Sequence, residues 1–195
     1  MVRVSNATPP PAEAPPSLVV RPARAGEAAA LAEVAAATFP LACPPAMTAE
    51  DIGDYVAEHL SEEHFAQYLA DPARSLLVLE EGTGSGGRLT GYSMLIHTPP
   101  ADPEVLAALT VRPSSMLSKF YVRPDAHGSG LAHRLLAATF DTAASTGARA
   151  VWLSVNDENL RAQKFYAKNG FRTVGRMDFP TARLVLRDFV LERIL

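Results

Sequence analysis

Residues 117–132 read L-S-K-F-Y-V-R-P-D-A-H-G-S-G-L-A, and they combine the features that a protein needs to hold a phosphate group. An apolar strand is followed by a turn and then by Gly128 and Gly130, directly before a helical pattern that begins at Leu131. Glycines let the backbone approach an anion closely, and the first N–H groups of a helix have no partner within the helix. The segment therefore predicts a phosphate-binding loop.

A second block, residues 159–171, reads N-L-R-A-Q-K-F-Y-A-K-N-G-F. Asn159 and Tyr166 are seven positions apart, so two helical turns place them on the same face. A phenol there can donate a proton to a leaving group. The alternative is that Tyr166 is a core aromatic with its hydroxyl in water.

Together the two blocks resemble the GNAT superfamily of acyl-CoA-dependent N-acetyltransferases, over about Leu18 to Leu195. The family patterns are V-x-P, then Q/R-x-x-G-x-G/A, and later N-x-x-A-x-x-[FL]-Y-x-x-x-G-F. His127 departs from the Gln or Arg that the family prefers at that position. The matching positions are Val122, Pro124, Gly130, Ala132, Asn159, Ala162, Phe165, Tyr166, Gly170 and Phe171.

The resemblance implies that acetyl-CoA is the cosubstrate and that Tyr166 protonates its departing sulfur. The strand before the loop would hold the pantetheine arm through main-chain hydrogen bonds, and Asn159 would bond to the same arm. An imidazole at position 127 is charged only near or below a pKa of roughly 6.5, so cofactor affinity is expected to vary with pH. The cofactor-binding residues implied are Phe120, Tyr121, Val122, His127, Gly128, Ser129, Gly130, Leu131, Ala132, His133 and Asn159.

The general base is not identified by the sequence. Strand alternation places positions 116, 118, 120 and 122 on one face, and these residues are Met116, Ser118, Phe120 and Val122. None of them is an acid or a histidine, so Ser118 is expected to hold a water that passes the proton on. Other titratable groups that could reach the site, each more typical of a surface, are His97, Glu80, Glu81, His59 and His64.

The expected reaction is transfer of an acetyl group from CoA to a primary amine by direct attack, with a non-catalytic acyl-CoA-binding module as the alternative. A dinucleotide-binding unit is set aside because His133 occupies the third glycine position. The acceptor is expected to be a small-molecule amine or a peptide amine, with a resemblance to the polyamine-acetyltransferase-like subset. Acidic residues that either attract such an amine or form solvated helix faces are Glu50, Asp51, Asp54, Glu58, Glu62 and Glu63.

The order of elements predicts one α/β (α+β) domain over residues 17–195, after a disordered proline-rich tail over residues 1–16. With the resemblance, this implies a central, mostly antiparallel mixed sheet of about seven strands flanked by helices. Strands are expected near 18–21, 75–80, 89–98, 116–122, 150–156, 171–177 and 184–194. Helices are expected near 26–39, 48–60, 61–69, 104–109, 131–146 and 159–168.

Composition excludes several functional classes. The 195 residues are 48% hydrophobic and carry a net charge of −3 with a pI of about 5.9, which argues against nucleic-acid binding. The single cysteine, Cys43, suits a reducing compartment, and no apolar run approaches the ~20 residues of a membrane span. No metal-ligand spacing is present. We expect a cytoplasmic protein without a metal or a membrane partner, and a homodimer is possible.

Overall fold

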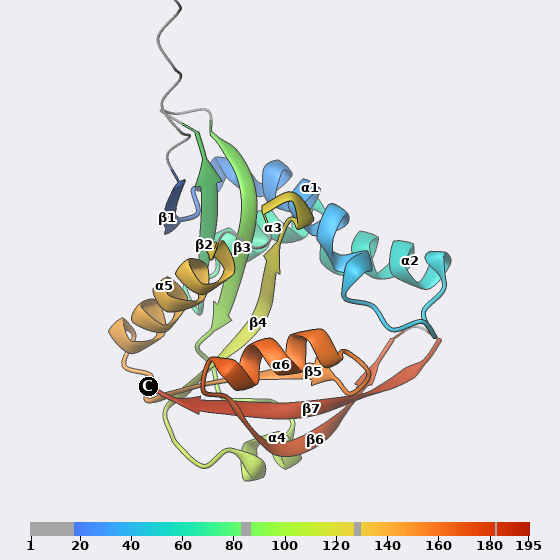
Figure 1. Cartoon of the computed structure of the whole chain (residues 1–195), viewed down its shortest axis with the longest axis vertical. Helices are drawn as coiled ribbons and strands as arrows, with labels where there is room; N and C mark the ends of the chain where they lie inside the picture. The colour runs from blue at the N-terminus through green and yellow to red at the C-terminus, as the bar shows by residue number, and fades with distance from the viewer. Residues whose placement is uncertain (1–17, 83–86, 127–129, 182) are drawn as a thin grey trace, which may run out of the picture.

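The computed structural model describes residues 18–82, 87–126, 130–181 and 183–195, and its centre is a seven-stranded sheet (Figure 1). The strand order is β1-β2-β3-β4-β5-β7-β6, and every neighbouring pair is antiparallel except β4 and β5. This confirms the predicted mixed sheet. The strands are β1 (Leu18–Pro22), β2 (Arg74–Glu81), β3 (Arg88–Ile96), β4 (Ser114–Val122), β5 (Ala150–Asn156), β6 (Arg172–Pro180) and β7 (Val185–Ile194).

Six α-helices of the described chain cover the two faces of this sheet. The helices are α1 (Ala28–Thr38), α2 (Ala49–His59), α3 (Glu62–Ala70), α4 (Pro103–Ala108), α5 (Leu131–Ser145) and α6 (Leu160–Lys168). Short 3-10 turns span Ala25–Glu27, Phe39–Leu41 (η2) and Pro124–Ala126. Thr48, Ser61 and Asn159 each cap a helix, because the side chain of each accepts a backbone N–H bond in its first turn.

The hydrophobic core lies on both faces of the sheet. On one face, α1 and α3 pack over β2 and β3 around Leu31, Phe65 and Tyr92. On the other, α5 and α6 cover the cluster that contains Leu136 and Leu153. A smaller cluster, with Val105, Trp152 and Val190, packs α4 against the β5–β7–β6 half of the sheet.

The sheet splits where its only parallel pair meets. β4 and β5 are paired only from Ser114 to Met116, opposite Ala150 to Trp152, and beyond that point the two strands diverge (Figure 1). Residues 117–121 of β4 therefore present a strand edge with no neighbouring strand on the β5 side among the described residues. Such an edge can pair with an extended ligand.

A β-bulge changes the predicted alternation of β4. The register against β3 shifts between Met94 and Leu95. Met94 is paired with Lys119 and Leu95 with Leu117, so Ser118 has no partner in β3. Met116 and Phe120 consequently pack into clusters on opposite faces. The prediction that positions 116, 118, 120 and 122 share one face is wrong, because the extra residue of a bulge reverses the alternation.

Most element boundaries agree with the sequence prediction. The limits of β5 are those expected, and α5 begins at Leu131 as predicted. β6 runs to Pro180, beyond the predicted end at Met177. The tail over residues 1–16 lies outside the described residues, so its predicted disorder and the domain boundary stay predictions. In the described part of the chain, no helix is long and apolar enough to cross a membrane.

Candidate active site

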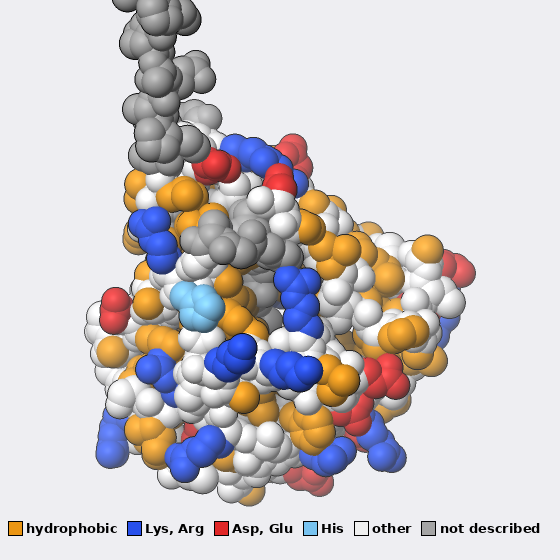
Figure 2. All heavy atoms as spheres, viewed as in Figure 1, with side chains coloured by type: hydrophobic (Ala, Val, Ile, Leu, Met, Phe, Trp, Pro, Cys, Tyr) orange, Lys and Arg blue, Asp and Glu red, His pale blue; other side chains and the backbone are white. Residues whose placement is uncertain are grey.

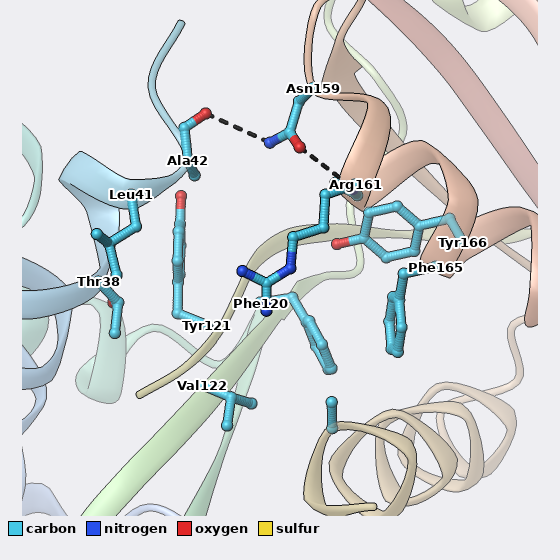
Figure 3. Close-up of a pocket in the computed structure, with 12 residues that line it drawn as sticks. Thr38, Leu41, Ala42, Phe120, Tyr121, Val122, Asn159, Arg161, Phe165 and Tyr166 are labelled. Atoms are coloured by element: carbon cyan, nitrogen blue, oxygen red, sulfur yellow. Dashed lines mark hydrogen bonds between the residues drawn. The ribbon is translucent and has the colours of Figure 1, made fainter. Parts of the chain in front are cut away.

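A cavity of about 200 Å³, the first cavity, opens between η2, β4 and the helices α5 and α6 (Figure 3). It runs along the strand edge of β4 that the split exposes. Six of the residues predicted from the sequence line it together. They are Phe120, Tyr121, Val122, Ala132, Asn159 and Tyr166, and the remaining lining residues are Thr38, Leu41, Ala42, Arg161, Ala162 and Phe165.

Tyr166 is held by aromatic neighbours while its hydroxyl points into the first cavity (Figure 3). Its ring meets Phe171 and Phe165 at centroid distances of 5.4 and 5.5 Å. Burial raises the pKa of the Tyr166 phenol well above its usual range, so the group stays protonated at neutral pH. Among the described residues no hydrogen-bond partner occupies this hydroxyl. It is available to a ligand.

Asn159 has both ends of its side chain engaged within the protein. Its Oδ1 accepts a hydrogen bond from the backbone N–H of Ala162 at 3.0 Å, which caps α6. Its Nδ2 donates to the carbonyl of Ala42 at 3.3 Å (Figure 3). Asn159 thus fixes the position of α6 against the η2 segment, and the predicted contact with pantetheine stays a prediction.

The helix α5 begins at the side of the first cavity. Its N-cap, Gly130, has φ +76°, a left-handed conformation that favours glycine, and a Cβ built there meets no atom within 4 Å. Ala132, in the first turn, lines the cavity. The N-terminal amides of a helix attract anions, which agrees with the predicted phosphate-binding role. The predicted residues His127, Gly128 and Ser129 lie outside the described residues.

Besides Gly130, two predicted cofactor residues of the described chain, Leu131 and His133, do not line the first cavity. Leu131 is 5% exposed and belongs to the core beneath α5. The His133 ring packs against Phe165 at 5.3 Å and borders a separate surface cavity with Lys168 and Arg193. The structure therefore places their side chains away from the cavity, while the backbone of Leu131 remains part of the helix start.

Basic side chains lie around the first cavity. Figure 2 shows Lys and Arg side chains gathered on the face that carries α5 and α6. Exposed basic residues of these helices are Arg134, Arg161, Lys164 and Lys168. In Figure 3 the Arg161 side chain extends into the first cavity between Tyr121 and Tyr166. The positive charge suits a ligand that carries phosphate groups.

A second cavity, of about 210 Å³, adjoins the first and lies in the split between β4 and β5. The two cavities share Ala42, Phe120, Tyr121, Asn159, Ala162 and Tyr166. The second cavity is otherwise lined by Phe39, Cys43, Pro44, Met47, Tyr55, Leu117, Ser118, Ser154, Val155, Asn156, Phe179, Leu186 and Asp188. Ligands bound in the two cavities would meet beside Tyr166. Ser118 lines only the second cavity.

Asp188 is the acidic residue of the second cavity, and the sequence analysis did not identify it. It is 7% exposed and lies in the middle of β7 opposite Asn156 of β5. Burial raises the pKa of its carboxyl, and hydrogen bonds from Ser154 and Asn156 partly oppose that rise. One sequence signal was present, because Asp188 alternates with Leu186 and Val190 on the apolar face of its strand.

The other titratable groups considered from the sequence lie elsewhere. His97 contacts Ser75 and Ser115 at 2.9 Å and lines neither cavity. Glu80 forms a 2.5 Å ion pair with Arg21 at the β1 edge. His59 belongs to α2, His64 to α3 and Glu81 to β2. None of these three residues lines either cavity.

Acidic residues of α2 are already paired. Arg183, between β6 and β7, contacts Glu50 at 2.7 Å, Asp51 at 3.1 Å and Asp54 at 3.3 Å. We call this group the Arg183 clamp. It ties the β6–β7 hairpin to α2 and compensates the charge of half of the acidic set that the sequence singled out.

Cys43 lines the second cavity without the properties of a nucleophile. Its thiol donates a hydrogen bond to the Phe39 carbonyl at 3.3 Å. Burial raises the thiol pKa to about 11, which keeps the reactive thiolate scarce at neutral pH. Cys43 therefore acts as a small apolar residue of the cavity wall. Among the described residues, no group of three potential metal ligands is arranged around a common point.

Known proteins resemble the chain in sequence and in fold. Residues 38–171 match the model of the acetyltransferase (GNAT) family. Uncharacterized N-acetyltransferases of Mycobacterium tuberculosis and Mycobacterium bovis are 44% identical over 165 residues, which is 85% of this chain and 96% of each relative.

Two solved structures are similar in fold. The PaiA N-acetyltransferase of Thermoplasma acidophilum, in complex with coenzyme A, has a TM-score of 0.70 at 18% identity and covers 92% of this chain and 99% of its own. The ribosomal-protein-S18-alanine N-acetyltransferase of Escherichia coli has a TM-score of 0.62 at 16% identity, covering 91% and 94%. At these identities the likeness concerns the fold alone.

Proposed function

The chain belongs to the acetyltransferase (GNAT) family and is an N-acetyltransferase, and we propose that it transfers an acetyl group from acetyl-CoA to a primary amine by direct attack. The observation that carries the proposal is the meeting of two cavities beside the free hydroxyl of Tyr166. The first cavity would take the donor, and the second would take the acceptor.

The first cavity fits the chemistry of acetyl-CoA. The open β4 edge lines the first cavity at Phe120 and Tyr121 and offers main-chain groups to the amides of the pantetheine arm. The start of α5 and the basic residues around it suit the pyrophosphate. The Thermoplasma PaiA structure of the same fold was determined with coenzyme A, which supports this choice of cosubstrate.

The reaction needs no covalent enzyme intermediate. The neutral amine nitrogen attacks the thioester carbon, and its electron pair forms the new C–N bond. The carbon–sulfur bond then breaks, and CoA leaves with that electron pair. One proton leaves the nitrogen and one is gained by the sulfur, so the products are an amide and the CoA thiol.

Tyr166 would supply the proton to the sulfur. A thiol has a pKa of about 8.5, so its thiolate is a tolerable leaving group even without help. Because burial raises the Tyr166 pKa, the phenol acts more as a hydrogen-bond donor to the developing negative charge than as a strong acid. We therefore expect a modest contribution from Tyr166. Ser118, on the acceptor side, would hold a water beside the amine.

The test is release of free thiol from acetyl-CoA by the full chain against a panel of amines, with mass spectrometry of the products. The panel contains 2-phenylethylamine, spermidine, an aminoglycoside and a peptide with a free N-terminus. Amine-dependent thiol release with a mass gain of one acetyl group supports the proposal. Tight acetyl-CoA binding without thiol release across the panel would contradict it and favour an acyl-CoA-binding module.

A further inference from the structure

The second cavity holds one carboxylate, and its walls combine an aromatic side with polar side chains such as Ser154 and Asn156. Asp188 is its acid, while Phe39, Tyr55 and Phe179 form an aromatic side. The Phe39 and Tyr55 rings are parallel, with centroids 4.6 Å apart, and Phe179 lies 6.0 Å from Tyr55. Aromatic faces bind apolar rings and cations, and a carboxylate binds a cation.

Asp188 has no cationic partner among the described residues. Its polar neighbours are Ser154 and Asn156, whose Nδ2 donates to it at 3.5 Å. Removing a carboxylate from water costs free energy unless a cation compensates it. A buried acid without such a cation, on the wall of a cavity, is therefore a group whose missing partner can be the ligand itself.

The surroundings of Asp188 select against a polycation. The acids outside the cavity that could bind a further ammonium group already have cationic partners. Asp157 contacts Arg176 at 3.9 Å, and three acids of α2 contact Arg183 in the Arg183 clamp. The cavity volume of about 210 Å³ is only moderately larger than the ~150 Å³ that encloses a benzene ring. One charge and one small ring, or an aliphatic body of similar size, match this space.

We infer that the acceptor is a primary monoamine carried on a small aromatic or apolar body, and that Asp188 binds its ammonium group and takes its proton before attack. The inference rests on the proposed function, since it assigns the acceptor side of that same site. The ammonium N–H bond breaks, its electron pair stays on nitrogen, and the proton passes to the Asp188 carboxylate. The neutral amine then attacks the thioester.

The first arm of the test compares kinetics of the full chain and two variants with 2-phenylethylamine and with spermidine. For the wild type we expect a higher kcat/KM with 2-phenylethylamine. Asp188→Asn should lower kcat/KM for that amine by about 10- to 100-fold, the value of a charge-assisted hydrogen bond, at unchanged acetyl-CoA affinity. The matched control Asp178→Asn, an exposed acid of β6 outside both cavities, should change neither.

A pH profile separates this role from a structural one. In the wild type, kcat/KM should fall as the pH drops through the Asp188 pKa, and Asp188→Asn should lose that fall. The other titratable groups that face Asp188 are Tyr55 from α2, Tyr121 from β4 and Asp157 after β5. Burial raises the pKa of both tyrosines, which keeps them neutral across this range, and Asp157 is paired with Arg176 at 3.9 Å.

The second arm measures binding of 2-phenylethylamine by calorimetry in the presence of CoA, and it is independent of turnover. A loss of at least about tenfold in amine affinity in Asp188→Asn supports the inference, whether or not acetylation is detected. An absence of acetylation would count against the proposed reaction alone. Wild-type kinetics and amine affinity in Asp188→Asn would overturn the inference and leave the transferase proposal intact. A preference for spermidine would overturn the assigned acceptor class.

Discussion

The first and second cavities share the wall around Tyr166, yet they differ in how they are built. The first is formed by backbone features: the open edge of β4, the start of α5 and the capped start of α6. The second is formed by side chains from η2, α2, β4, β5, β6 and β7. Backbone features suit a ligand that every member of a family shares. Side chains suit a ligand that changes from one member to the next.

The strongest effect is expected from a change to the backbone features of the first cavity. Gly130→Val places a side chain in the open space at the start of α5 and strains the left-handed backbone. We expect acetyl-CoA affinity, measured by calorimetry, to fall about 100-fold, equivalent to about 2.7 kcal/mol.

The matched control is Gly147→Val at the other end of α5. Gly147 has a similar φ of +87° and equally open space, so it carries the same backbone strain away from both cavities. Its acetyl-CoA affinity should stay near that of the wild type. Equal losses of affinity in the two variants would mean that strain, and not the approach of a phosphate, is responsible.

A smaller effect is expected where the two cavities meet. Tyr166→Phe removes the hydroxyl but keeps the ring against Phe165 and Phe171. We expect kcat to fall about 10- to 30-fold while acetyl-CoA affinity and melting temperature change little, because thiolate leaves without much help. An unchanged kcat in steady-state thiol release would remove Tyr166 from the reaction.

Lys119 tests whether β4 acts on the cavities through its backbone. Its Nζ lies 5.3 Å from the Tyr68 ring centre, away from both cavities, and burial lowers the pKa of Lys119 to about 8. Below about pH 8, Lys119 is charged in both the folded and the unfolded state, and burying that charge lowers the free energy of unfolding. This loss of stability disappears as the pH rises toward the usual lysine pKa of about 10.4.

Lys119→Met should therefore raise the free energy of unfolding at pH 6 by about 1 kcal/mol, and the gain should shrink above pH 10. Urea denaturation at both pH values measures it. The variant should keep kcat within about twofold of the wild type. A large loss of kcat would mean that Lys119, with its lowered pKa, takes part in the reaction.

The smallest effect concerns the side-chain cavity. Arg183→Ala removes the Arg183 clamp, which ties the hairpin carrying Phe179 and Leu186 to α2. Because exposed ion pairs contribute little and are screened by salt, we expect the amine KM to rise only about two- to fivefold. Arg24→Ala, which breaks an exposed ion pair beside β1, is the control and should leave this KM unchanged. Equal KM values in Arg183→Ala and the wild type would show that the clamp does not shape the cavity.

The same contrast explains how much the sequence predicted. Signals carried within a few residues identified their elements correctly, as the limits of β5 and the start of α5 at Leu131 show. The bulge at Ser118 was missed because it depends on the register with β3. The alternation of Asp188 with Leu186 and Val190 marks it only as an acid on an apolar strand face. Its place in a cavity was missed because the cavity is assembled from segments that lie far apart in the chain.

The division of labour between the two cavities is tested most directly by a crystal structure of the full chain with coenzyme A. We predict that the pantetheine arm lies along the β4 edge at Phe120 and Tyr121 in the first cavity, with its sulfur beside the Tyr166 hydroxyl. The second cavity, including Asp188, should remain open to an amine. A pantetheine arm that fills the second cavity, or that avoids the β4 edge, would contradict the account.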